Sequence, residues 1–202
     1  MTETGAHLQT VVLCGTSNAE LWPISRSDDP IDLTIPSEGS PSLLAATIRR
    51  YENLSPAPLL LVVQEGQEEL YRSHIAQHDI LDEDRYEVLT VPGNRGSAFS
   101  IALAAVHVKL RDPECVMLIT PSNQTIDADD RFQIALDRAY EVASLDQRIA
   151  LVATAPSDEM TPHAFVKVGL ELKGHPGVFR VRGFVDRPSP VQAARLSDMG
   201  AL

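Results

Sequence analysis

Only two of the 202 residues are cysteines, Cys14 and Cys115. Two thiols are too few for the dense disulfide framework that holds small secreted domains together. Both lie at the ends of apolar segments, so we expect free, buried thiols. The first ten residues contain no apolar signal core, which leads us to expect a cytoplasmic protein.

Long apolar segments and basic residues are also scarce. No apolar run approaches the ~20 residues that a membrane-spanning helix needs, so we expect no membrane partner. The chain has 17 Lys and Arg residues against 28 Asp and Glu residues, and its formal net charge is −11. This charge excludes a protein that binds nucleic acid through a general basic surface. Any anion site must therefore be built locally, from backbone amides or individual arginines.

The length and composition that remain favour a globular fold. Hydrophobic residues make up 44% of the chain, and 202 residues suffice for a sizeable core. No linker or internal repeat separates parts of the sequence. We therefore predict a single domain over residues 1–202.

Apolar segments alternate with amphipathic ones along the first three quarters of the chain. The predicted strands are residues 11–14, 58–63, 86–91, 115–120 and 149–154. The predicted helices are residues 41–52, with Ser40 as the N-cap, 66–78, 97–111, and 128–144, with Asp127 as the cap. Strand–helix repetition with nearly continuous apolar strands predicts an α/β domain with a mostly parallel sheet.

The pattern changes near the C-terminus. Residues 164–172 and 178–184 alternate with period two around Lys-Gly-His-Pro-Gly, which predicts an antiparallel hairpin with one solvated face. Ser189 and Pro190 then predict the start of a last helix, which ends at Gly200. The polar loop over residues 27–40 is long enough to suggest a functional role.

Five segments, in order, carry a resemblance to a known family. They read VVLCGTSNAELWPISR (11–26), VPGNRGSAFSIALAA (91–105), LITPSNQTI (118–126), APSDEMTPHAFVKVG (155–169) and GFVDRP (183–188). The chain resembles the sugar-phosphate nucleotidyltransferases, most closely the mannose-1-phosphate guanylyltransferases. The resemblance implies a Rossmann-like, GT-A-like three-layer nucleotide-diphospho-sugar transferase fold with a hairpin near the C-terminus.

The resemblance also implies two groups of ligand-binding residues. Nucleotide contacts are expected from Gly15, Thr16, Ser17, Asn18, Arg95, Ser97 and Asn123. Contacts to the sugar phosphate are expected from Asp186 and Arg187, which replace a Glu–Lys pair of the family. For each group the alternative is an ordinary surface loop without a ligand.

The charged groups of the family's chemistry are replaced at three positions. Glu20 stands where the family has its phosphate-binding arginine, and Asn123 stands where an aspartate holds Mg²⁺. The family's Pro-Lys-Gln-Phe motif corresponds to residues 30–33, so Ile31 replaces the catalytic lysine. A carboxylate repels phosphate, isoleucine cannot stabilise phosphoryl transfer, and an amide is a poor magnesium ligand. We therefore assign no catalytic and no metal-binding residue.

Other combinations of residues carry weaker signals. His74 and His78 are four residues apart on a predicted helix, but no third ligand lies nearby in sequence. The acids Asp127, Asp129 and Asp130 are interpreted as helix-start residues and not as a replacement metal site. The isolated histidines are His107, His163 and His175.

Three functions stay open. The first is an impaired nucleotidyltransferase homologue that binds a nucleotide or nucleotide sugar, or that acts as a non-catalytic partner of an active paralogue or in a homo-oligomer. The second is an active guanylyltransferase-type enzyme that uses Mg²⁺ and transfers a nucleotidyl group to a sugar 1-phosphate. The third is an interaction module without a ligand.

Overall fold

The computed structural model describes residues 8–15, 21–26, 28–93, 95–126, 130–156 and 164–202. The chain divides into two compact units, residues 1–127 and residues 128–202. Each unit is described by itself, and the expectation of one domain over the whole chain stays a prediction. No helix in the described ranges combines the length and the apolar character needed to cross a membrane.

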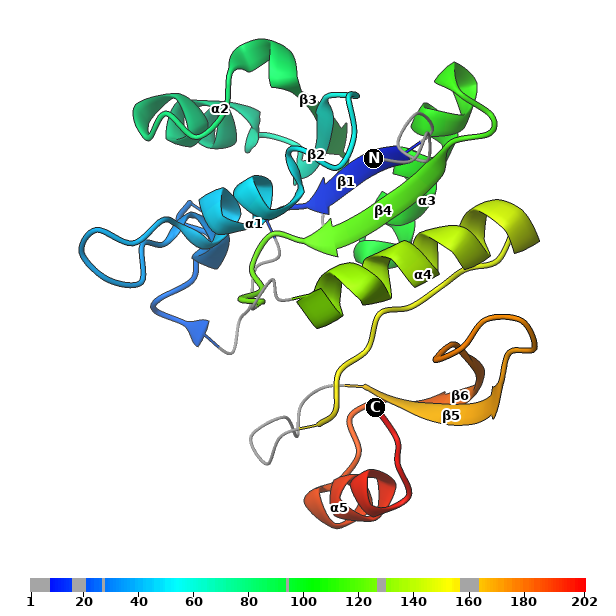
Figure 1. Ribbon diagram of the computed structural model, residues 1–202. Coiled ribbons are helices and arrows are strands. Elements are labelled where there is room, and N and C mark those ends of the chain that lie inside the picture. Colours follow the sequence, from blue (N-terminus) through cyan, green and yellow to red (C-terminus); the bar gives the residue numbers. More distant parts are fainter. Residues whose placement is uncertain (1–7, 16–20, 27, 94, 127–129, 157–163) are drawn as a thin grey trace. The chain divides into compact units, whose positions relative to one another are not determined.

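The first unit is built around a parallel sheet. Its elements are β1 (Leu8–Leu13), η3 (Ile31–Leu33), α1 (Leu43–Tyr51), β2 (Leu59–Gln64), α2 (Glu68–Gln77), η4 (Glu83–Arg85), β3 (Tyr86–Val91), α3 (Ser97–Arg111) and β4 (Val116–Pro121). The four strands lie in the order β3-β2-β1-β4, and all three pairs are parallel. The predicted α/β class and mostly parallel sheet are confirmed (Figure 1).

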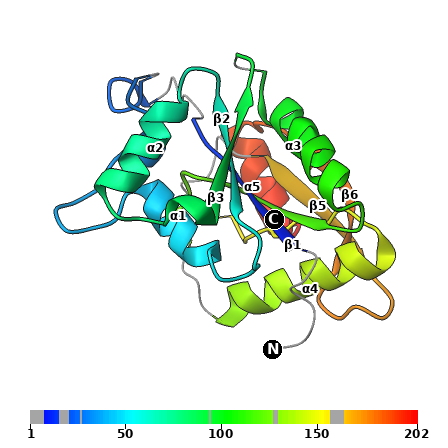
Figure 2. The ribbon, with the colours of Figure 1, turned by 90° about the horizontal axis from the view of Figure 1, so that it is seen from above.

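Helices cover both faces of this sheet at β2, whose side chains point alternately to the two faces. Leu59, Leu61 and Val63 of β2 pack into a cluster with residues of α1 and α2. Leu60 and Val62, from the same strand, pack on the opposite face with residues of α3. Figure 2 shows α1 and α2 on one side of the strands and α3 on the other. The expected three layers are therefore confirmed in this unit.

The start of α1 differs from its prediction. The N-cap is Ser42, whose hydroxyl accepts a hydrogen bond from the Ala45 amide at 3.2 Å. The predicted cap, Ser40, instead donates its hydroxyl to the Ser37 carbonyl at 2.7 Å and closes the preceding loop. Two serines on either side of Pro41 satisfy the same local pattern, and only the loop geometry selects between them.

The second unit contains a helix, a hairpin and a final helix. Its elements are α4 (Asp130–Asp146), β5 (Phe165–Glu171), β6 (Phe179–Val185) and α5 (Pro190–Asp198). The two strands are antiparallel, as predicted. A small cluster forms where Phe165 packs with Ala193, Leu196 and Ala201. Figure 1 shows the C-terminus beside the start of β5, where the Leu202 amide donates to the Val166 carbonyl at 3.0 Å.

The last helix begins as predicted, and the strand predicted before the hairpin does not form. Ser189 and Gln192 form a reciprocal capping box with Pro190 in the first turn of α5. Residues 149–154 form no strand, and Ile149 is 96% exposed. A strand needs a hydrogen-bonded neighbour, and within the described part of this unit β5 and β6 pair only with each other.

Candidate functional site

A cavity opens at the carboxyl edge of the parallel sheet. Three strands, β1, β2 and β3, contribute their last residues to it, and the first turn of α3 closes one side. Its volume is about 130 Å³, and its lining residues are Leu13, Cys14, Val62, Val63, Gln64, Val91, Gly93, Arg95, Gly96, Ser97 and Ser100. In open α/β sheets, ligands bind in the crevice outside the carboxyl ends of the strands.

Two of the predicted nucleotide-binding residues, Arg95 and Ser97, meet in this cavity. Among the lining residues that the structure describes, Arg95 is the single charged side chain. Gly96 precedes α3 with φ 79°, in the left-handed region, and caps the helix without a side-chain hydrogen bond. The first-turn amides of a helix have no intrahelical acceptor, so this end of α3 offers donors and a partial positive charge to an anion.

Gly15 lies at the end of β1 beside the cavity but takes part in a different contact. Its φ is 70°, and a side chain at this position would run into the Gln67 side chain. Its amide donates to a carboxylate oxygen of Asp32 at 3.3 Å. The one glycine of the loop that the structure describes is therefore directed toward an acid of the protein itself.

Asp32 is the centre of a buried polar network that the sequence reasoning missed. The side chain is 1% exposed, and the Tyr71 hydroxyl donates to its two oxygens at 3.0 and 2.9 Å. The Ser122 hydroxyl, just after β4, donates to Oδ2 at 2.5 Å. The only local signal was a charged residue between apolar neighbours in the short η3 segment, which gave no indication of these partners.

This network changes the acidity of the neighbouring groups. Burial raises the pKa of the Cys14 thiol well above its usual value, and the charge of Asp32 raises it further. Burial also raises the pKa of the Tyr71 hydroxyl, followed by the influence of Cys14 and Asp32. Both groups therefore stay protonated, and neither is suited to act as a nucleophile or base at neutral pH.

The replaced catalytic positions lie close to this network. Ile31 directly precedes Asp32 in η3 and is half-buried. Asn123 follows Ser122, whose amide donates to the Leu13 carbonyl at 3.0 Å, so it lies near the ends of β1 and β4. Thr16, Ser17, Asn18 and Glu20 lie outside the described residues, so their predicted roles stay predictions.

The donors that the structure describes at these positions do not fit a Mg²⁺ ion. Magnesium requires hard oxygen ligands, usually including carboxylates, in octahedral geometry. Asn123 offers an amide oxygen, and the oxygens of Asp32 already accept hydrogen bonds from three residues. Within the described ranges, no group of three or more His, Cys, Asp or Glu side chains is arranged to hold a metal.

The two predicted sugar-phosphate residues belong to the second unit. Asp186 and Arg187 follow β6 and are exposed. Arg187 has φ 45°, a left-handed conformation that is uncommon for a residue with a side chain. Neither forms an ion pair with another described residue, so the positive charge of Arg187 is available to a ligand. Their role stays a prediction.

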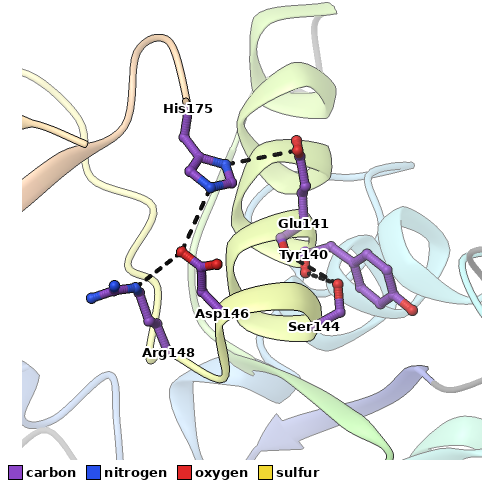
Figure 3. Close-up of polar contacts among 6 residues, drawn as sticks. All are labelled: Tyr140, Glu141, Ser144, Asp146, Arg148 and His175. Atoms are coloured by element: carbon purple, nitrogen blue, oxygen red, sulfur yellow. Dashed lines mark hydrogen bonds and ion pairs between the residues drawn. The ribbon is translucent and has the colours of Figure 1, made fainter. Parts of the chain in front are cut away.

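The second unit also contains a histidine that is not isolated, contrary to our prediction for His175. In the turn between β5 and β6, its Nδ1 lies 3.7 Å from Glu141 Oε1 and its Nε2 lies 3.6 Å from Asp146 Oδ2. Arg148 Nε lies 3.1 Å from the same oxygen of Asp146. Figure 3 shows the ring between the two carboxylates of α4. The carboxylates face opposite edges of the ring, so this arrangement ties the turn to α4 and does not suit one metal ion.

The comparisons of this chain with known proteins agree with one another. The family model described as "Nucleotidyl transferase" matches residues 9–201. The alginate biosynthesis protein AlgA of Pseudomonas aeruginosa is 29% identical over 189 residues, which cover 91% of this chain and 37% of that protein. A mannose-1-phosphate guanylyltransferase of Escherichia coli K12 is 26% identical over 186 residues, which cover 90% of this chain and 38% of that protein.

A solved structure agrees in fold. It is a protein of Thermus thermophilus described as a mannose-1-phosphate geranyltransferase, and it matches with a TM-score of 0.81 at 24% identity. The match covers 96% of this chain and 54% of that chain. The chain therefore spans less than two fifths of the two curated relatives and about half of the solved structure.

Proposed function

Because the chain belongs to the nucleotidyl transferase family, we propose that its first unit binds a nucleotide or a nucleotide sugar, with impaired nucleotidyl transfer. The observation that carries the proposal is the cavity at the carboxyl edge of the sheet. There, Arg95 supplies the charge, Ser97 a hydroxyl, and the first turn of α3 its backbone amides.

The cavity that the described residues line forms one part of a larger nucleotide-binding site. A volume of about 130 Å³ is smaller than the 300–1,000 Å³ of typical complete ligand pockets. The cavity therefore accommodates one portion of a nucleotide. We propose that the remaining contacts to the nucleotide come from Gly15, Asn123 and the loop residues Thr16, Ser17 and Asn18.

Loss of the catalytic charges supports the impairment. Removing a single preorganised electrostatic contact typically costs about 3–4 kcal/mol of transition-state stabilisation. Ile31 provides no positive charge where the family uses lysine, and Asn123 provides no carboxylate for a metal. The donors that the structure describes at these positions do not fit Mg²⁺, so no step of the proposed function passes through a metal. Such losses are not additive, but each alone would remove about half of the ~8 kcal/mol advantage of a modest enzyme.

The names of the relatives suggest which ligands to test first. Guanylyl transfer to mannose 1-phosphate involves GTP and GDP-mannose. We propose that these two compounds bind the first unit, and that Asp186 and Arg187 contact the sugar-phosphate portion. A cytoplasmic location, a homo-oligomer and association with an active paralogue stay predictions.

Isothermal titration of the whole chain with GDP-mannose and GTP tests the binding proposal. We expect saturable binding that weakens at least tenfold in Arg95→Ala, because the mutation removes the one charged side chain among the described lining residues. The matched control is Arg49→Ala, which removes the same charge from an exposed position on α1 in the same unit. Absence of binding in the unmodified protein, or equal loss in both variants, would contradict the proposal and favour the interaction module.

A pyrophosphate-release assay with GTP, mannose 1-phosphate and Mg²⁺ tests the impairment. We expect no turnover above the protein-free background. Turnover that is abolished in Arg187→Ala would establish the alternative, an active transferase with relocated ligands.

A further inference from the structure

Asp32 is a buried carboxyl group that the proposed function does not use. It lies in η3 and is joined by hydrogen bonds to Gly15 after β1, to Tyr71 on α2 and to Ser122 after β4. These partners converge on the carboxyl edge of the parallel sheet. That edge is where the cavity with Arg95 opens.

The carboxyl group of Asp32 acts as a hydrogen-bond acceptor. Both oxygens accept, and an ionised carboxylate is an acceptor-only group. The groups that face it are neutral: the Gly15 amide, the Tyr71 hydroxyl and the Ser122 hydroxyl. The single proton of the Ser122 hydroxyl also has the Leu13 carbonyl, at 3.0 Å, as an alternative acceptor. In the described part of the chain, no lysine or arginine forms an ion pair with Asp32, so its negative charge is stabilised by dipoles and is not neutralised by a cation.

Asp32 does not line the cavity but lies close to it, because it accepts from the amide of Gly15, the residue that follows the lining residue Cys14. Cys14 lines the cavity, and the charge of Asp32 is a cause of its raised pKa. The Gly15 amide, which in the family resemblance belongs to the phosphate-binding loop, donates to Asp32. The protein therefore places its own anion at the start of the loop. The family motif has a neutral glutamine at the position of Asp32.

We propose that Asp32 is a specificity-determining residue, which makes the site prefer a nucleotide sugar over a nucleoside triphosphate. The inference rests on the nucleotide site proposed above. A nucleotide sugar has no terminal phosphate and carries less negative charge than the corresponding triphosphate. A fixed buried anion beside the site penalises the more highly charged ligand more strongly, because repulsion in a partly buried site is weakly screened.

Isothermal titration of the unmodified chain and of Asp32→Asn, with GDP-mannose and GTP, tests this inference. The amide is nearly isosteric, and the Tyr71 and Ser122 hydroxyls can rotate to accept from it. We expect the unmodified protein to bind GDP-mannose at least tenfold more tightly than GTP. In Asp32→Asn, GTP affinity should rise at least tenfold and GDP-mannose affinity should change less than threefold.

The matched control is Asp84→Asn, the same chemical change at an exposed position in η4, before the amino end of β3. It should leave the ratio of the two affinities unchanged. Circular dichroism and thermal unfolding verify that each variant is folded. If Asp32→Asn does not fold, Asp32→Gln, which introduces the family residue, replaces it with the same expected gain for GTP.

The possible results distinguish a failure of the specificity proposed for Asp32 from a failure of the proposed nucleotide binding. An unmodified protein that prefers GTP, or a folded Asp32 variant without a gain for GTP, overturns the inference. In both cases the loss of binding in Arg95→Ala would leave the proposed nucleotide site intact. If neither ligand binds any of the proteins, both proposals fail.

Discussion

The two compact units bury their strands to very different extents. In the first unit, Leu59, Leu60, Leu61, Val62 and Val63 of β2 are all at most 3% exposed. In the second unit, Phe179, Val181 and Phe184 of β6 are 49%, 47% and 63% exposed. A central parallel strand is covered by helices on both faces, whereas the two-stranded hairpin, among the described residues of its unit, packs on a small cluster around Phe165.

The two units also differ in how far their charged side chains are exposed to solvent. The first unit buries Asp32 within a network of neutral donors. The second unit keeps its charges nearer to solvent, as with Asp146 and Arg148, which are 33% and 47% exposed. A substitution in the first unit therefore removes interactions that water cannot replace, whereas the equivalent change in the second unit exposes groups that are already solvated.

The largest difference in stability between the two units is expected when one leucine in each unit is replaced by alanine. Leu61→Ala should lower the free energy of unfolding by about 2–5 kcal/mol, because Leu61 is fully buried and the change leaves a cavity. Leu170→Ala should change it by less than about 0.5 kcal/mol, since Leu170 on β5 is 82% exposed. Urea unfolding followed by circular dichroism measures both. Similar losses in the two variants would mean that the second unit is packed in solution.

A second test compares two aspartates. Asp32→Ala leaves the Gly15 amide and the Tyr71 hydroxyl without this acceptor, and each unsatisfied buried donor costs about 1–3 kcal/mol. The Ser122 hydroxyl can still donate to the Leu13 carbonyl at 3.0 Å. We expect a net loss of about 2–3 kcal/mol, because the removal of a buried charge offsets part of it. The exposed Asp186→Ala should be nearly neutral. A neutral Asp32→Ala would show that the network is not formed in solution.

The N-cap serines of α1 and α5 are expected to differ less in their contribution to the unfolding free energy. The Ser42 hydroxyl accepts from the Ala45 amide and lies 2.9 Å from His74 Nε2, and its side chain is buried. The Ser189 hydroxyl caps the exposed start of α5. We expect Ser42→Ala to lower the unfolding free energy by about 2 kcal/mol and Ser189→Ala by about 0.5–1 kcal/mol. Thermal and urea unfolding of the two variants should give this order, and the reverse order would contradict the comparison.

Features that depend on local periodicity could be predicted from the sequence. The nearly continuous apolar runs at β2 and β4 predicted strands, and β2 is covered on both faces as expected, whereas Ile119 of β4 is 37% exposed. Ser189 with Pro190 predicted the start of α5. The period-two segments predicted the hairpin of β5 and β6. Each of these features is encoded in one continuous segment, the longest being the hairpin from Phe165 to Val185, so tertiary context was not needed.

Features that depend on contacts between distant segments could not be predicted. The partners of Asp32 are 17, 39 and 90 residues away in sequence, and only the topology brings them together. His175 meets its carboxylates for the same reason. Residues 149–154 have the composition of a buried strand, but strand formation requires a neighbour that local composition cannot supply. Arg95 and Ser97 could be placed together, because they lie two residues apart in a single connection.

The smallest expected effect is a pH dependence of the unfolding free energy, and it comes from a single side chain of the first unit, His74. Burial lowers the pKa of His74, and the neighbouring His78, whose ring centroid lies 4.6 Å away, lowers it further. Below the usual histidine pKa of about 6.5, the unfolded chain therefore binds a proton that the folded protein still excludes. Stability should decrease slightly as the pH falls below about 6.5, and this decrease should level off below the folded pKa.

Urea unfolding of the unmodified protein and of His74→Gln between pH 5 and pH 8 measures this effect. The variant should lose the part of the pH dependence that lies below about pH 6.5, because glutamine does not titrate. His78→Gln should reduce the effect without abolishing it, since burial is the first cause of the shift and remains in that variant. A stability that increases on acidification in the unmodified protein, but not in His74→Gln, would mean that His74 gains a proton on folding, contrary to its packing against Ser42 in the first unit.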